Sequence, residues 1–542
     1  KFFSGIARLT YDLPWVDGLN AKATYSYQNT DSENKSYLRK YNLYRYNSSN
    51  DTYTTGYTAN DPSNLSVGND HVDDQTLQFS LNYAKTFAEK HSVSGLLLFE
   101  RTSTNSSYLS AYREFLLDNL DELFAGVPTN QSNDGSSAEI AREGYVGKFN
   151  YDYAGKYLLE AGFRYDGTYK VAKDQRFGFF PNVSVGWRIN EENFLKDVTA
   201  LDNLKLRASF GKVGDDGGND ASSGLYIVPF RYIPGYNYPE NNYQFGSSLI
   251  PGLITSGLTN PLLTWYNSYT SNIGLDVSLW AGKLSASVDV FYRKRTGLLA
   301  TRLLSLPNTF GAALPQENLN GDNTRGFEIE LTHKNTKGDW TYSISPNLTF
   351  SRSKNGYLEQ AAQSNSLSNY QGNMTDRWRN ISRGYVANGQ FQNQQEINTA
   401  PIQDTQGNKT LLPGDIRYED LNGDGVIDSR DQTVIGRGDT PEIFFGLNLN
   451  VNFKNFDFSV LLQGASNFNR YYSEELQNPF FNNANSLSLY QDRWHREDLY
   501  DPNSAWVPGK YPSTIISGSA NNQRYSTFWL QDATYLRVKN VD

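Results

Sequence analysis

The chain has 542 residues and a formal net charge of -9, which disfavours nucleic acid as a partner and leaves small neutral or cationic ligands open. Its mean hydropathy is -0.62 and no apolar run approaches the length of a membrane-spanning helix, so an α-helical membrane protein is excluded. Cysteine is absent, which excludes thiol catalysis and cysteine-based metal sites. Aromatic residues make up 14% of the chain, a content that suits rings at a membrane interface or against a ligand.

Alternation of apolar and polar residues predicts strands along the whole chain. In the clearest pair, Ile273, Leu275 and Val277 alternate with polar residues, and Val288 and Val290 repeat the pattern after a tight turn. About fifteen strands of roughly 8 to 12 residues are predicted, which is the length that crosses a bilayer when tilted. In chain order they are 3–12, 18–28, 75–85, 91–101, 142–153, 157–167, 178–189, 204–211, 272–280, 284–294, 325–334, 340–351, 443–452, 456–464 and 533–540.

The connections between these strands alternate between short and long. Residues 13–17 and 87–90 are short turns, whereas long polar segments follow the second and fourth strands. Two connections depart modestly from this alternation. Residues 167–177 are short for a connection on the long-loop side, and residues 190–203 are long for a connection on the short-turn side. In an outer-membrane barrel short turns face the periplasm and long loops face outside. The pattern therefore predicts an all-β, transmembrane antiparallel β-barrel that extends over residues 1–542 without an internal linker.

Five stretches of the chain resemble, in the same order, the barrel of SusC-type TonB-dependent transporters of Bacteroidota, the SusC/RagA family. They are 149–167 with 176–189, 272–276 with its hairpin, 325–331, 413–428 and 528–540. The resemblance covers nearly the whole chain, and it implies an outer-membrane location.

The resemblance also implies parts that are not recognised in this sequence. Such transporters have a barrel of about 22 strands, an N-terminal plug, a TonB-contacting segment and a SusD-type lipoprotein that covers the extracellular face. Because the first predicted turn is short, the first strand runs toward the periplasm, and parity predicts an odd number of strands before Lys1. About five strands before and two after would complete the barrel, so we expect the chain to be part of a longer protein.

One acidic stretch has the spacing of a calcium-binding loop. It lies within residues 413–436, in the long excursion that we expect outside the cell, and Gly425 occupies the sixth position, where the chain must turn sharply. Asp stands at the twelfth position, where EF-hands carry Glu, and its shorter side chain weakens the case for bidentate ligation. A solvated acidic turn is the alternative; if Ca²⁺ binds, we expect a structural role. The candidate ligands are Asp420, Asn422, Asp424, the Val426 carbonyl, Asp428 and Asp431.

Other groups of residues predict contacts with a ligand, a partner or the lumen, and they do not predict a catalytic site. Tyr232, Tyr236, Tyr238 and Tyr243 cluster with asparagines, which suits stacking on sugars or peptides, although such loops also pack on one another or on the partner lipoprotein. Glu328 and Glu330 share one face of a strand, so lumen lining is expected and catalysis is not. Residues 211–218 lack the end of a phosphate-binding motif and are interpreted as a loop root.

Three functional hypotheses follow. The favoured one is TonB-energised import of oligosaccharides or peptides across the outer membrane, with a SusD-type lipoprotein as partner. The second is a SusC-like barrel that serves as a scaffold in a larger outer-membrane assembly without transport. The third, a soluble all-β enzyme or lectin, requires the apolar face to be buried. The sequence does not distinguish glycan from peptide cargo.

Overall fold

The computed structural model describes residues 1–117, 120–218, 225–237, 243–303, 309, 311–514 and 518–542. Among these residues fifteen strands form one sheet, and each corresponds to one predicted strand, so the all-β prediction is confirmed. The strands of the sheet, in the order in which they pair, are β1 (Phe2–Asp12), β2 (Leu19–Leu38), β5 (Ser63–Phe87), β6 (His91–Phe115), β7 (Gln131–Tyr153), β8 (Tyr157–Thr168), β9 (Phe177–Arg188), β10 (Leu201–Asp215), β15 (Tyr266–Leu279), β16 (Leu284–Thr301), β17 (Gln316–Lys337), β18 (Trp340–Asn355), β23 (Ile443–Phe453), β24 (Phe456–Ser466) and β29 (Tyr535–Val541).

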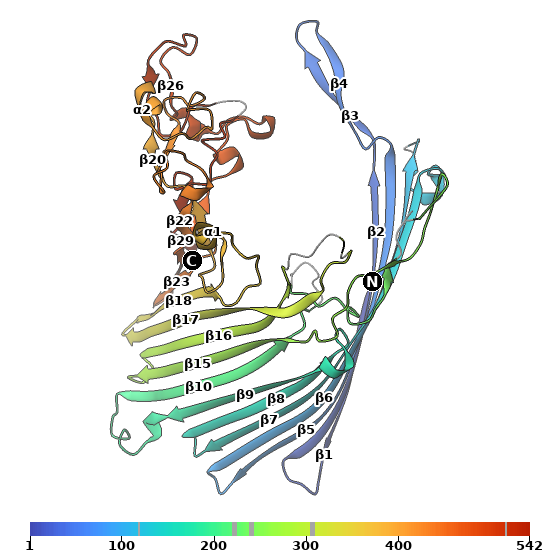
Figure 1. Cartoon of the computed structure of the whole chain (residues 1–542). Helices are drawn as coiled ribbons and strands as arrows, with labels where there is room; N and C mark the ends of the chain where they lie inside the picture. Colours follow the sequence, from blue (N-terminus) through green and yellow to red (C-terminus); the bar gives the residue numbers. More distant parts are fainter. Residues whose placement is uncertain (118–119, 219–224, 238–242, 304–308, 310, 515–517) are drawn as a thin grey trace. The chain divides into compact units, whose positions relative to one another are not determined.

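The chain divides into two compact units. The first comprises Lys1–Val185 and Gly211–Trp265, and the second comprises Gly186–Phe210 and Tyr266–Asp542. In the first unit, β1, β2, β5, β6, β7 and β8 pair antiparallel, each with the next (Figure 1). In the second unit, β15, β16, β17, β18, β23, β24 and β29 do the same.

Short and long connections alternate along the sheet as predicted. The short β7–β8 turn places Ala154 and Gly155 at positive φ, as a tight hairpin turn requires. The long connections carry small elements of their own, including the β3–β4 hairpin, which continues beyond the end of β2 (Figure 1). These elements are the pairs β3 (Tyr41–Asn47) with β4 (Thr52–Ala59), β11 (Tyr236–Asn237) with β14 (Ile254–Thr255), β12 (Tyr243–Phe245) with β13 (Ser248–Ile250), β19 (Ile381–Gly384) with β22 (Thr433–Arg437), β20 (Ala387–Gln390) with β21 (Ile416–Tyr418), β25 (Asn469–Tyr471) with β28 (Leu530–Asp532) and β26 (His495–Arg496) with β27 (Trp506–Val507), and the helices α1 (Ser366–Gly372) and α2 (Gln394–Thr399).

The registers of the second unit separate an apolar face from a polar face. Ile273 lies opposite Val290, whereas Asp276 lies opposite Ser287 on the other face. On this polar face the Arg207 guanidinium donates to both oxygens of Asp276, at 3.0 Å each, so an ion pair links neighbouring strands. Glu328 and Glu330, which lie opposite Asp289 and Ser287, line the same polar face.

In the first unit, large apolar side chains stand exposed on one face of the sheet. Leu97 is 61% exposed, and with Leu9, Phe79 and Leu81 it borders an apolar groove of about 620 Å³. A contiguous exposed apolar surface of this kind marks contact with lipid or another apolar partner. Among the described residues, no helix is both long enough and apolar enough to cross a bilayer.

Many strands are longer than the sequence pattern predicts. β5 was expected at 75–85, but it begins at Ser63, and its added residues are mostly polar. β10 continues to Asp215, so the interpretation of residues 211–215 as a loop root was wrong. Backbone pairing continues beyond the apolar band because inter-strand hydrogen bonds do not depend on which side chains meet lipid.

The long loops of the second unit have a packed interior. Ile416, Tyr418, Ile427 and Trp529 form a buried cluster, here called the loop core. The Tyr418 hydroxyl donates to the Asn521 carbonyl at 2.7 Å, which joins the two long loops that follow β18 and β24. These loops are therefore a folded layer with its own hydrophobic core.

Candidate functional site

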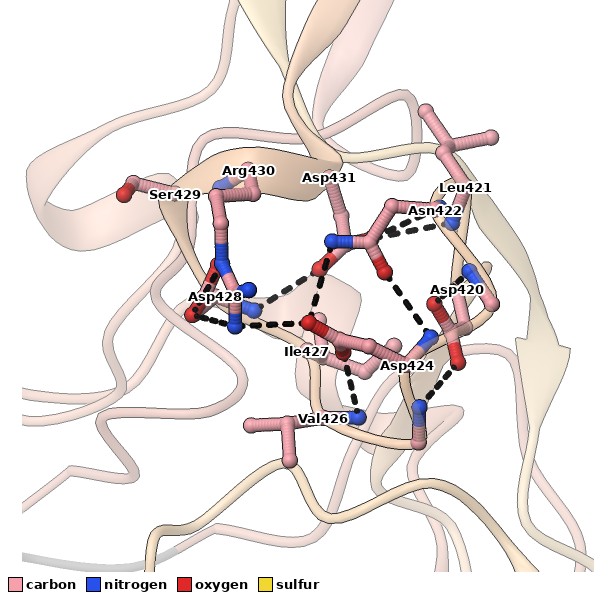
Figure 2. Close-up of polar contacts among 12 residues, drawn as sticks. Asp420, Leu421, Asn422, Asp424, Val426, Ile427, Asp428, Ser429, Arg430 and Asp431 are labelled. Atoms are coloured by element: carbon pink, nitrogen blue, oxygen red, sulfur yellow. Dashed lines mark hydrogen bonds and ion pairs between the residues drawn. The ribbon is translucent and has the colours of Figure 1, made fainter. Parts of the chain in front are cut away.

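Residues 420–431, here called the acidic loop, follow β21 and turn tightly around their own side chains (Figure 2). The Asp420 carboxylate accepts hydrogen bonds from the backbone N–H groups of Gly423 and Gly425, both at 2.7 Å. Asn422 accepts from the Asp424 N–H at 2.9 Å, and Asp424 accepts from the Val426 N–H at 3.0 Å. The bonds of Asn422 and Asp424 are Asx turns, and Gly425 completes the bend at a φ of 81°. The local sequence therefore fixes the first half of the loop.

Asp431 ties the end of the loop to its beginning. Its side chain is fully buried, and its carboxylate accepts from the N–H groups of Leu421 at 2.9 Å and Asn422 at 3.4 Å. It also accepts from the Asp428 N–H at 2.9 Å, across the short helix η6 (Ser429–Asp431). One carboxylate therefore satisfies three backbone donors that would otherwise be unpaired.

Arg430 supplies a positive charge inside the loop. Its Nη2 lies 2.6 Å from Asp424 Oδ2 and 2.8 Å from Asp428 Oδ2 (Figure 2). The EF-hand spacing does not predict this role of Arg430, because the motif specifies only oxygen ligands. As the side chains are placed, no group of three His, Cys, Asp or Glu in the described part of the chain is arranged to hold a metal ion.

The acidic loop is anchored on the loop core. Ile427 is buried in that core, and its N–H donates to the Ile402 carbonyl at 2.8 Å. The Arg524 guanidinium donates to the Ile427 carbonyl at 3.0 Å, while its cationic centre lies 4.9 Å from the Tyr385 ring centroid. The order of the acidic loop therefore depends on Arg524, which lies 97 positions from Ile427 in the sequence.

The acidic loop is expected to lose order in acid. The N–H groups of Gly425 and Gly423 hold the pKa of Asp420 below its ordinary value, and the Arg430 side chain does the same for Asp428. A carboxyl whose pKa is lower in the folded state stabilises that state above its unfolded pKa of about 4, and the gain disappears as the pH falls through the folded value. Hydrogen exchange over 420–431, corrected for intrinsic rates, should be constant from about pH 6 to 8 and should accelerate below about pH 4.

Asp420→Asn is the matched variant for this pH prediction. Because the amide keeps a carbonyl acceptor but does not titrate, the acid-dependent acceleration should be smaller in this variant. Equal acceleration in the variant and the parent, or none in the parent, would contradict the assignment.

The predicted tyrosine cluster is only partly described. Tyr236 is 69% exposed on β11, whereas the Tyr243 hydroxyl donates to the Leu253 carbonyl at 3.1 Å. Tyr232 lies beside Phe230, with ring centroids 6.3 Å apart. In the described ranges no ring contact links Tyr232, Tyr236 and Tyr243, and Tyr238 lies outside the described residues.

The antiparallel sheet, its polar and apolar faces and its alternating connections define a transmembrane β-barrel wall of the outer-membrane type. The sequence profile of TonB dependent receptor-like β-barrels matches residues 3–406, so the chain belongs to that family. Family membership places the protein in the outer membrane, and the family comprises receptors and transporters and not enzymes.

Curated relatives share this assignment. The chain is 26% identical over 489 residues to TonB-dependent receptor P26 of Formosa agariphila, covering 85% of this chain and 45% of the relative. It is 29% identical over 408 residues to TonB-dependent receptor SusC of Bacteroides thetaiotaomicron, covering 73% of this chain and 37% of the relative. The chain thus spans less than half the length of these relatives.

Solved structures agree on the fold. The structure of the RagAB peptide importer in its open-open state matches with a TM-score of 0.74 at 17% identity, over 100% of this chain and 54% of that chain. The closed-closed state matches with a TM-score of 0.72 at 18% identity, over 100% of this chain and 55% of that chain. At this identity the likeness establishes the shared fold.

Proposed function

We propose that the protein imports oligosaccharides or peptides across the outer membrane, with energy supplied through TonB. The match of residues 3–406 to the TonB-dependent receptor-like β-barrel carries this proposal. It is supported by the similarity to SusC and by the fold shared with the RagAB peptide importer. In this mechanism the barrel wall encloses the path, and force transmitted from TonB moves a plug out of it.

We further propose that a SusD-type surface lipoprotein works with this barrel. The folded loop layer of the second unit offers a structured surface for such a partner, because Trp529 and Tyr418 give it a buried core. The alternative is that the barrel is a scaffold in a larger assembly.

Affinity purification of the native full-length protein distinguishes these two functions. Mass spectrometry should find a SusD-type lipoprotein as the main partner of an importer. Recovery of export or assembly machinery in its place would support the scaffold and contradict import.

We also propose that the acidic loop binds Ca²⁺ in a structural role. The donor set fits: five side chains and the Val426 carbonyl offer oxygen atoms at the spacing that Ca²⁺ prefers, and Gly425 makes the required turn. The charge of Arg430 now lies between Asp424 and Asp428, so the cation must displace it. Bound Ca²⁺ would then hold the loop against the loop core through Ile427.

Arg430→Ala is expected to strengthen Ca²⁺ binding. Exposed ion pairs contribute little, so removing the two competing contacts should tighten binding only modestly, by about 2- to 10-fold. Isothermal titration of Ca²⁺ into the full-length protein in detergent measures this change. Arg470→Ala, which removes an exposed arginine that pairs with Asp439, is the control and should leave binding unchanged. Weaker Ca²⁺ binding in Arg430→Ala would contradict displacement.

A further inference from the structure

A cavity of about 500 Å³ opens in the first unit, among the strands β6 to β10. Its lining combines charged and aromatic side chains, and none of them belongs to the acidic loop or to the tyrosine cluster. The charged and aromatic side chains that line it include Arg142, Arg164, Asp166, Phe180, Lys212 and Trp265.

The cavity lies on the polar face of the sheet. Arg164 and Asp166 alternate along β8 with Phe163 and Tyr165, and successive side chains of a strand point to opposite faces. Phe163 borders the exposed apolar groove on the other side. In a barrel of this family the polar face is the lumen, so the cavity opens toward the interior through which a solute would pass.

Two buried aromatic rings form a rigid floor. Phe180 and Trp265 meet edge to face, with ring centroids 5.3 Å apart and planes at 64°. The Trp265 indole N–H donates to the Arg176 carbonyl at 3.0 Å, which fixes its orientation. A Cβ atom at Gly214 would lie 2.0 Å from the Phe180 ring, so the ring packs directly on the glycine backbone. The floor thus presents an apolar surface that does not need to rearrange.

The arginines of the cavity are already paired. Arg164 makes a bidentate contact with Asp166, with Nε–Oδ2 and Nη2–Oδ1 distances of 2.9 Å. Arg142 lies 2.6 Å from the carboxylate of Asp216, which is buried. The positive charge of each guanidinium is therefore already balanced by a carboxylate.

Lys212 differs from the arginines. Its ammonium lies 5.5 Å from the centroid of the Phe180 ring, and in the described part of the chain it has no carboxylate or hydrogen-bond partner. A half-buried ammonium beside an apolar floor is stabilised by an anion that also brings an apolar body. The cavity therefore offers one free positive charge next to an aromatic surface.

We propose that this cavity binds a ligand that carries a carboxylate, with the carboxylate on Lys212 and the adjoining apolar part on Phe180 and Trp265. Peptides with a free C-terminus and acidic oligosaccharides both present this chemistry. This proposal rests on the proposed import, because import would bring a solute past the cavity. Equilibrium binding needs neither TonB nor a membrane potential, so its failure is distinguishable from a failure of import.

The test is calorimetric titration of the full-length protein in detergent with two pairs of probes. The peptide pair is N-acetyl-Ala-Ala-Phe with a free carboxylate and the same peptide as its C-terminal amide. The sugar pair is trigalacturonate and its methyl ester. At least one acid should bind about tenfold or more tightly than its neutral partner, the factor expected for a charge-assisted hydrogen bond, and the acid that binds identifies the source.

Variants locate the binding. Lys212→Gln should remove the advantage of the acid over its neutral partner, and Lys212→Arg should retain it. Lys205→Gln, on the same strand but not part of the cavity lining, is the matched control and should behave as the parent. Equal affinities within both probe pairs, or full binding of the acid by Lys212→Gln, would overturn the proposal.

Discussion

Trp529→Ala is expected to unfold the loop core of the second unit while leaving the sheet intact. Trp529 is 1% exposed, and its indole N–H donates to the Asn522 carbonyl at 2.6 Å. Truncating a buried tryptophan costs about 3–5 kcal/mol, which is large for a loop layer with so small a core. The strands of the fifteen-stranded sheet do not include this residue, so the hydrogen bonds of that sheet should remain.

Hydrogen exchange with mass spectrometry measures the Trp529 prediction in the full-length protein. Protection should fall over 381–438 and 469–532, including the acidic loop, while β15 to β18 keep theirs. Trp506→Ala is the control, because Trp506 is only half-buried and packs against Arg496. Equal loss of protection in the two variants, or loss across the sheet, would contradict the description of the loops as a separately packed layer.

The second large effect is expected at Asp431. Asp431→Ala leaves the N–H groups of Leu421, Asn422 and Asp428 without their acceptor. A hydrogen bond to a charged acceptor contributes about 1.5–3 kcal/mol, so the loss of these part-buried bonds should cost the loop about 3 kcal/mol. It should also lose Ca²⁺ binding, because the twelfth ligand is removed.

A conservative variant separates the two consequences at Asp431. Asp431→Asn keeps one carbonyl acceptor, so most of the loop order should remain, but it removes the charge that Ca²⁺ requires. Calcium titration together with hydrogen exchange over 420–431 measures both quantities. Asp439→Ala, at an exposed aspartate outside the loop, is the control. Ca²⁺ binding of parental affinity in Asp431→Ala would contradict the proposed site.

The membrane-crossing strands were predictable because their side chains alternate between lipid and the lumen, which gives the sequence an alternation of apolar and polar residues. Strand β16 was expected at 284–294 and begins at Leu284, because the turn before it is marked by a change of pattern. The outer extensions, such as 63–74 of β5, were not predictable because their mostly polar sequence has no sustained alternation of apolar and polar residues.

The site was predictable only where it is local in sequence. The motif identified Asp420, Asn422 and Asp424 as neighbours in one loop, and their hydrogen bonds to the loop backbone are local in sequence. The anchoring of this loop by Arg524 connects residues 97 positions apart, and no periodic pattern carries that information. The cavity around Lys212 likewise requires several strands to be paired before its lining residues meet.

Energised import is tested most directly by solute depletion in living cells. Cells with the full-length gene, cells lacking it and cells lacking TonB are given one defined mixture of oligosaccharides and peptides, and mass spectrometry follows the medium. We expect at least one component to disappear only when both the gene and TonB are present. If no component depends on the gene, or if uptake through it proceeds equally without TonB, the protein is not a TonB-energised importer.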